Sequence, residues 1–165
     1  MAKPRTQAAQ EAVPLNDARV LVVEARFYDD IADMLLAGAM RELEKAGASV
    51  ERISVPGALE IPPAIAIALD AAKQQGRAYH GVVALGCVIR GETSHYDIVA
   101  GESARGLMQM ALTHHLPVGN GILTVDTQAQ AIERADKWDK GAAAARAALA
   151  LIRVKRHYAV DREQP

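Results

Sequence analysis

A nearly uninterrupted apolar run occupies residues 82–89, near the middle of the chain, and ends abruptly at a polar cluster. Such runs, rich in β-branched side chains, are typical of strands buried on both faces, as the central strands of parallel sheets are. Residues 90–95, which follow, are polar apart from one glycine. Because ligands of open α/β sheets bind beyond the carboxyl ends of the strands, this loop is where we expect chemistry.

The loop contains the groups of an anion-binding site. Gly91 lets the backbone approach a ligand, and Thr93 and Ser94 supply hydroxyl groups. A helix is expected to begin next, and the N–H groups at its N-terminus favour a bound anion. His95 stands beside them, and histidine is the side chain that most readily exchanges protons near neutral pH. The pattern predicts a phosphate pocket with a proton-transferring group beside it.

Strand-like and helix-like segments alternate along the chain. Short apolar runs predict strands at residues 20–24, 49–55, 82–89 and 118–125. Helices are predicted from Asp29 or Asp30 to Gly47, from Pro62 to about Gln75, after His95, after a capping box of Thr127 and Gln130, and from Asp139 or Lys140 to about Tyr158. Four strands separated by helical crossovers predict an α/β fold with one parallel sheet covered by helices on both faces.

Two helices, the second and the last, carry more apolar surface than one buried face needs. Residues 62–72 are apolar almost all round, and the last helix presents a wide alanine face at residues 142–145, 147 and 148. The third helix has one apolar stripe, formed by Ala100, Ala104, Leu107, Met108, Ala111 and Leu112. A helix without a polar side is buried on both sides, so we expect another subunit to cover part of this surface. The alternative is an ordinary core helix covered by its own chain.

The length of 165 residues and the composition predict a single domain, placed at 17–158, between a disordered tail at 1–16 and a short tail at 159–165. A formal net charge of −1 gives no general attraction to nucleic acid. Cys87 is the only cysteine, so no disulfide can form within the chain and a cytoplasmic location is expected. We find neither the apolar core of a signal peptide nor a stretch long enough for a membrane span.

Four further side chains are candidates for the site. Phe27 follows the first strand on the expected ligand side, where it could stack on a planar ring, although a lone aromatic is more often in the core. Glu60 follows the second strand and could accept hydrogen bonds, or simply be a solvated residue at a helix start. Arg134 and Lys140 flank a loop and could bind a phosphate, although such cations are usually surface residues.

Three segments form a specific combination: ARFY at 25–28, VPGALEIP at 55–62 and, most specific, ALGCVIRGETSH at 84–95. GILT at 121–124, and AIERA and DKG within 131–141, have matching spacing. Over residues 18–158 the chain resembles the lumazine synthase family. The resemblance implies a flavodoxin-like three-layer sandwich with a four-stranded parallel sheet, and active sites shared between neighbouring subunits of a homopentamer. No metal and no organic cofactor are expected.

The resemblance also implies the reaction, the penultimate step of riboflavin biosynthesis. In it, 5-amino-6-ribitylamino-uracil condenses with 3,4-dihydroxy-2-butanone 4-phosphate to give 6,7-dimethyl-8-ribityllumazine, orthophosphate and water. The family's ring-stacking aromatic matches Phe27, and its ribityl and pyrimidine contacts match Ala58, Leu59, Glu60 and the backbone around Cys87 and Val88.

The family's phosphate site matches Gly91, Glu92, Thr93 and Arg134, and we add Lys140 to it. The histidine held responsible for proton transfer matches His95. The chain departs from the family at Asn120, where many members place an aromatic side chain from the neighbouring subunit. The loop at 135–140 is shorter than in shell-forming members, has no glycine and carries Trp138, so we expect isolated pentamers.

Two rival functions are weaker. A receiver-type signalling module has a similar alternation, but it needs an acidic residue at the end of the third strand, where this chain has Val88, Ile89 and Arg90. A flavin- or pterin-binding protein without activity would keep Phe27 and Glu60 but has no use for the anion site. The sequence has no Walker loop, dinucleotide fingerprint or zinc-ligand spacing.

Overall fold

The structure, a computed structural model, describes residues 13–160. Its elements are β1 (Arg19–Ala25), α1 (Asp29–Lys45), β2 (Ser49–Val55), η1 (Ala58–Glu60), α2 (Ile61–Gln74), β3 (Gly81–Ile89), α3 (His95–His114), β4 (Val118–Val125), α4 (Gln128–Ala135) and α5 (Lys140–Val160). The predicted alternation is confirmed, and the strands at 49–55 and 118–125 agree to the residue. The single turn η1 was not predicted, because three residues are too few to show a helical period.

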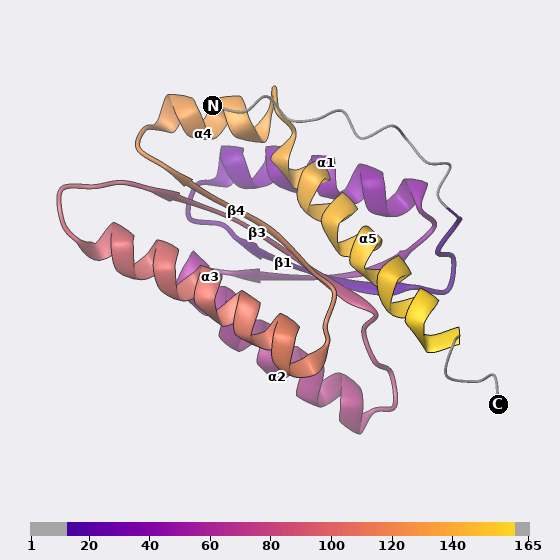
Figure 1. Cartoon of the computed structure of the whole chain (residues 1–165). Helices are drawn as coiled ribbons and strands as arrows, with labels where there is room; N and C mark the ends of the chain where they lie inside the picture. The colour runs from indigo at the N-terminus through magenta and orange to yellow at the C-terminus, as the bar shows by residue number, and fades with distance from the viewer. Residues whose placement is uncertain (1–12, 161–165) are drawn as a thin grey trace.

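The four strands form one parallel sheet in the order β2-β1-β3-β4. The pairing of β1 with β3 ends at Glu24 and Leu85, whereas that of β3 with β4 continues to Ile89 and Val125. Strand β3 therefore reaches four residues farther than its pairing with β1, and it carries the loop at 90–94 outward from the sheet (Figure 1).

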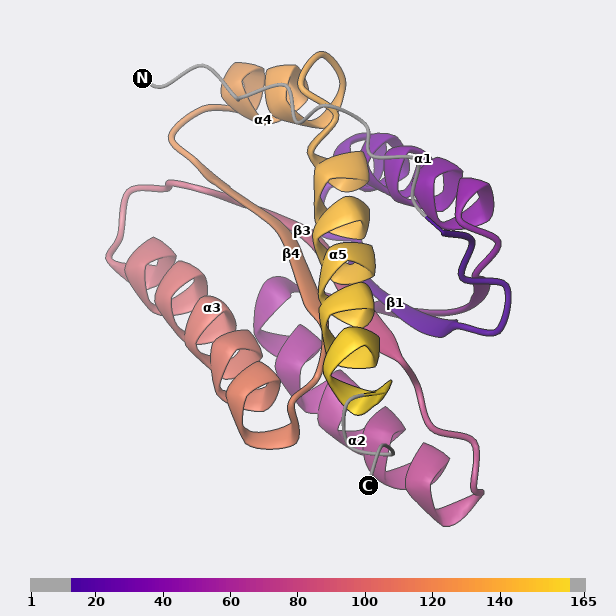
Figure 2. The same cartoon turned by 45° about the vertical axis from the view of Figure 1, so that its right-hand side comes forward.

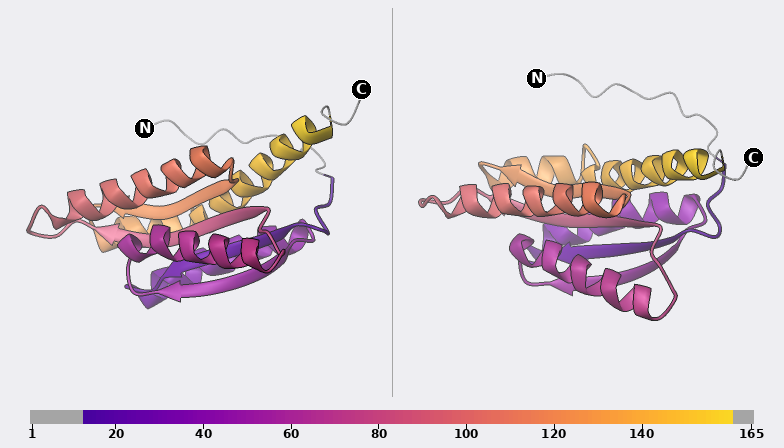
Figure 3. Two further views of the ribbon diagram at one scale, coloured as in Figure 1. Left: turned by 90° about the horizontal axis from the view of Figure 1, so that it is seen from below. Right: turned by 60° about the horizontal axis from the view of Figure 1, so that its bottom comes forward.

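Helices cover both faces of the sheet, so the predicted three-layer α/β sandwich is confirmed. Helices α1, α4 and α5 pack on one face and α2 and α3 on the other (Figures 1 and 3). The first core includes Leu35, Val83 and Ile152, and the second includes Ile61, Val82 and Leu107. Strand β3 contributes to both cores, as its continuous apolar sequence predicts.

The alanine face of α5 packs on its own chain, which corrects the expectation that another subunit covers it. Ala142, Ala144, Ala145 and Ala148 are all buried against the sheet and α1. Helix α5 lies close over β4 (Figure 2), and a side chain at Gly119 would collide with the backbone of Ala144. The small residues therefore allow a close helix–strand approach within one subunit. Only Ala147 of the predicted face is exposed.

Helices α2 and α3 leave apolar side chains uncovered. In α2 only Ile61, Ile65 and Ala72 are buried, and Ile67 is 72% exposed. The predicted stripe of α3 is buried only in part: Leu107 is buried, but Met108 and Leu112 are 61% and 70% exposed. Residues 13–160 therefore leave this side of α2 uncovered, which disagrees with the alternative of an ordinary core helix.

The ends of the folded body differ slightly from the predicted limits. Of the tail expected at 1–16, residues 1–12 lie outside the described part. Leu15, however, is buried in the core, and its N–H donates to the carbonyl of Ala46 at 2.7 Å. At the other end α5 continues to Val160, and residues 161–165 of the expected tail lie outside the described part.

Candidate active site

The candidate residues lie along the edge of the sheet where the parallel strands end, on the left of Figure 1. Phe27 follows β1, residues 58–60 follow β2, residues 90–95 follow β3, and α4 with Arg134 follows β4. Turn η1 also contacts β3 and α3, and α4 contacts α1 and β3. Parallel strands bring their carboxyl ends to one side, so segments far apart in sequence share this edge.

Phe27 is exposed, which excludes the alternative that its ring belongs to the core. Its side chain is 72% exposed, and its ring meets Tyr28 edge-on with centroids 5.0 Å apart. The preceding residue, Arg26, donates hydrogen bonds to Asp29 at 2.9 Å and Asp33 at 2.7 Å, both in α1. The hydrogen bond to Asp33 is the main cause that raises the pKa of Arg26 above its ordinary value. Arg26 thus ties the short β1–α1 connection to the helix, leaving Phe27 free to meet a ligand.

The segment after β2 presents its backbone and one carboxylate to this edge. Ala58 is buried, whereas Glu60 is exposed at the start of α2 and its side chain forms no cap hydrogen bond. In β3, Cys87 and Val88 are also buried, so that side-chain contact with a ligand is unfavourable there. Burial raises the pKa of the Cys87 thiol to about 11. Ala58, Cys87 and Val88 are therefore suited to contact a ligand through backbone groups.

The loop between β3 and α3 carries the residues that were predicted to bind an anion. His95 is the first residue of α3, one residue earlier than the predicted start, and its backbone N–H lies 3.4 Å from the hydroxyl of Thr93. Gly91 and Glu92 are exposed. Backbone N–H groups at this helix start, with a hydroxyl and an imidazole beside them, could bind an anion and move a proton.

Arg90 fixes this loop, a role that the sequence reasoning missed. Its Nε donates to Asp126 at 3.1 Å, and its guanidinium lies 4.1 Å from the centre of the Tyr96 ring. The signal was available: Arg90 and Asp126 each come directly after paired strands, so parallel pairing places them side by side.

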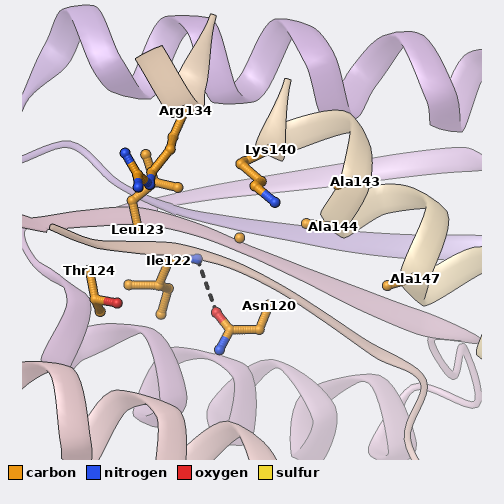
Figure 4. A pocket seen from close by; sticks show the side chains of 10 residues that line it. Asn120, Ile122, Leu123, Thr124, Arg134, Lys140, Ala143, Ala144 and Ala147 are labelled. Carbon is orange, nitrogen blue, oxygen red and sulfur yellow. Dashed lines mark hydrogen bonds between the residues drawn. The ribbon is translucent and has the colours of Figure 1, made fainter. Parts of the chain in front are cut away.

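A groove of about 330 Å³ lies over β4 and brings together Asn120, Arg134 and Lys140. Figure 4 shows Arg134 and Lys140 on the α5 side of the strand, while Asn120, Ile122 and Thr124 project on the other side. Ala143, Ala144 and Ala147 of α5 complete the wall. Of the residues predicted for the site, only these three meet in this groove.

The two cations of the groove have no carboxylate partner within residues 13–160. Arg134 donates to the carbonyl of Gln130 at 3.2 Å, and Lys140 forms no ion pair there. Arg26 and Arg90, by contrast, pair with aspartates. A groove with two positive charges and no bound carboxylate is a suitable site for an anion.

A second groove, of about 350 Å³, lies on the other side of β4 and was not predicted. Tyr96 and Ser103 of α3 line it with Asn120 and Thr124. The Asn120 side-chain oxygen accepts a hydrogen bond from the Ile122 N–H at 3.0 Å, which fixes the amide against the strand (Figure 4). Neither of these two grooves is lined by Phe27, His95 or the loop at 91–93.

Two other features bear on the expected chemistry. Among residues 13–160, no cluster of three or more histidine, cysteine, aspartate or glutamate side chains is arranged to bind a metal ion. No helix in the same part of the chain has the length and apolar character needed to cross a membrane.

Comparisons with known proteins agree with the motifs. The sequence model of the family described as 6,7-dimethyl-8-ribityllumazine synthase matches residues 17–156. A protein of that name from Azorhizobium caulinodans is 60% identical over 158 residues, which cover 94% of this chain and 98% of the relative. Another from Methylocella silvestris is 62% identical over 153 residues, covering 92% of this chain and 93% of the relative. The chain belongs to the 6,7-dimethyl-8-ribityllumazine synthase family.

Proposed function

We propose that this transferase condenses 5-amino-6-ribitylamino-uracil with 3,4-dihydroxy-2-butanone 4-phosphate at a site shared between two subunits of a pentamer. The activity follows from membership of the family, whose name gives the product, 6,7-dimethyl-8-ribityllumazine. The exposed ring of Phe27 and the backbone at residues 58–60 and 87–88 suit the uracil and its ribityl chain. The single observation that best supports a phosphorylated substrate is the pair of cations, Arg134 and Lys140, in a groove that no carboxylate of the described residues lines.

Two half-sites in one chain favour a shared site. The loop with His95 and Thr93 extends from β3, whereas Arg134 and Lys140 line a groove that does not include that loop. The exposed apolar side chains of α2 and α3, Ile67 and Met108 among them, give neighbouring subunits a surface on which to pack. In the ring, the groove cations of one subunit would face the anion loop of the next.

The chemistry needs orientation more than a strong acid or base. The 5-amino group attacks the ketone and, with loss of water, forms an imine. Phosphate leaves as an anion that Thr93, the amides of α3 and Arg134 stabilise. The enol that remains rearranges to a ketone, and the ribityl-bearing amine attacks this ketone and closes the ring with loss of a second water. His95 moves protons between these steps. Because the substrates react readily with each other, holding them together accounts for most of the acceleration.

The direct test is to incubate the purified protein with both substrates and follow lumazine fluorescence together with released orthophosphate. We expect both products at equal rates, well above the reaction without protein, and none when either substrate is omitted. A rate equal to the uncatalysed background would contradict the proposal. Tight riboflavin binding together with that background rate would favour the binding-protein alternative. The lone buried Cys87 suits a reducing compartment, and we keep the cytoplasm as the proposed location.

A further inference from the structure

Trp138 faces both cations of the β4 groove. It lies in the short turn between α4 and α5, and its indole ring is 4.8 Å from the guanidinium carbon of Arg134 and 5.8 Å from the ammonium nitrogen of Lys140. Both distances are measured to the ring centre and fall within the range of cation–π attraction. The two cations thus share one aromatic partner between their helices.

The turn that carries Trp138 is held from both sides. The backbone N–H of Trp138 donates to the backbone carbonyl of Glu133 at 3.0 Å. Asp139, in the left-handed region with φ 46°, accepts a hydrogen bond from the Ala142 N–H at 3.2 Å and pairs with Arg41 of α1. Because the backbone on either side is fixed, the half-buried indole is held beside the two cations rather than carried on a loose loop.

An aromatic ring beside these cations suits phosphate binding better than a carboxylate would. The ring face attracts positive charge and restrains the long side chains, but it does not neutralise them. A carboxylate in the same place would compete with the phosphate of the substrate. We infer that Trp138 is a positioning residue that holds Arg134 and Lys140 oriented for the phosphate of the butanone substrate, an inference that rests on the proposed function.

The first test separates the Michaelis constants of the two substrates. Trp138→Leu, which keeps an apolar side chain but removes the ring, is expected to raise the Michaelis constant for the butanone phosphate roughly three- to tenfold. The Michaelis constant for the uracil and kcat should change less than about twofold. In Trp138→Phe, which retains a ring, the Michaelis constant for the butanone phosphate should return most of the way to the wild-type value. Tyr158→Leu, at an exposed aromatic near the far end of α5, is the matched control and should change neither constant.

A purely structural role predicts a different result. If Trp138→Leu lowers the melting temperature and weakens both substrates equally, or if Trp138→Phe is no better than Trp138→Leu, the inference is overturned. Unchanged constants in Trp138→Leu would overturn it as well.

A second readout does not depend on turnover, because Trp138 is the only tryptophan in the chain. Titration of the assembled protein with inorganic phosphate should give a saturable change in tryptophan fluorescence, as the anion draws the cations into new positions. Arg134→Ala should reduce that change, and chloride at equal ionic strength should not produce it. If the tryptophan fluorescence of the wild-type protein does not change when phosphate is added, the inference is contradicted. If that response occurs but no lumazine forms, the proposed function fails while the cation–ring contact stands.

Discussion

The guanidinium of Arg26 donates a hydrogen bond to the fully buried carboxylate of Glu24 at 3.1 Å. Arg52 and Ser54 of β2 donate to the other oxygen of the same carboxylate at 2.6 and 2.9 Å. Glu24 therefore joins two strands to the residue that directly precedes Phe27. A buried carboxylate with three donors is stable only while all of them remain in place.

Glu24→Ala should lower the free energy of unfolding by about 3 kcal/mol, because it leaves Arg26 and Arg52 without their shared carboxylate. Glu51→Ala is the matched control: Glu51 pairs with Arg19 on the same strand pair but is half exposed, and its loss should cost less than about 1 kcal/mol. Urea denaturation at one fixed protein concentration measures both. If the free energy of unfolding falls equally in the two variants, the burial of Glu24 adds nothing to stability.

His95→Ala should lower kcat roughly 10- to 100-fold, less than loss of an essential nucleophile, since part of the chemistry runs unaided. The acidic limb of the wild-type pH profile should disappear in the variant. Steady-state rates over a range of pH, at saturating concentrations of both substrates, measure this. If the rates and the pH profile of the variant match those of the wild type, His95 has no part in proton transfer.

Cys87 should resist alkylation in the native protein. Burial disfavours the reactive thiolate and raises the pKa of the thiol from 9.0 to about 11, so at pH 8 almost all of it stays protonated. The same shift means that stability from this group is intact below pH 9 and is lost as the pH rises toward 11. Mass spectrometry after iodoacetamide treatment should show slow labelling without urea and rapid labelling with it. Rapid labelling of the native protein would place the thiol at the surface.

Isolated pentamers are the expected assembly. Ile67, Met108 and Leu112 are exposed in one chain and need cover, whereas the turn at 136–139 is short, charged and without glycine. Native mass spectrometry should find a species of about 88 kDa, five times the 17.6 kDa of the chain. A monomer would refute the ring, and a species near one megadalton would refute the expectation drawn from the turn.

The sequence predicts the elements better than it predicts which faces they bury. Apolar runs located the strands, and the capping box of Thr127 and Gln130 at the start of α4 is present as predicted. Helical periodicity, however, tells which residues share a face but not what covers it. The alanines of α5 meet Gly119 and Gly121 of their own β4, and Met108 of α3 stays exposed. Those outcomes depend on how closely distant segments approach.

The sequence could predict the edge of the sheet at which the candidate site lies and the residue types in it, but not which of these side chains contact one another. The motifs place Phe27, His95 and Arg134 after strands of one parallel sheet, so a common edge follows from topology. The contact of Trp138 with two cations does not follow, because the path of a short turn between two helices decides it. In the proposed function the anion loop of one chain meets the cation groove of a second chain, and one sequence does not specify that pairing.

A mixed-subunit experiment tests the shared site most directly. His95→Ala and Arg134→Ala chains, each weakly active alone at low butanone phosphate, are co-expressed in equal amounts and purified as one assembly. If His95 of one subunit and Arg134 of its neighbour form a site, random mixing restores about one quarter of the sites, and the mixture should show about a quarter of the wild-type activity. If both residues serve the same subunit's site, no intact site can form. Activity no higher than the average of the two variants would contradict the account.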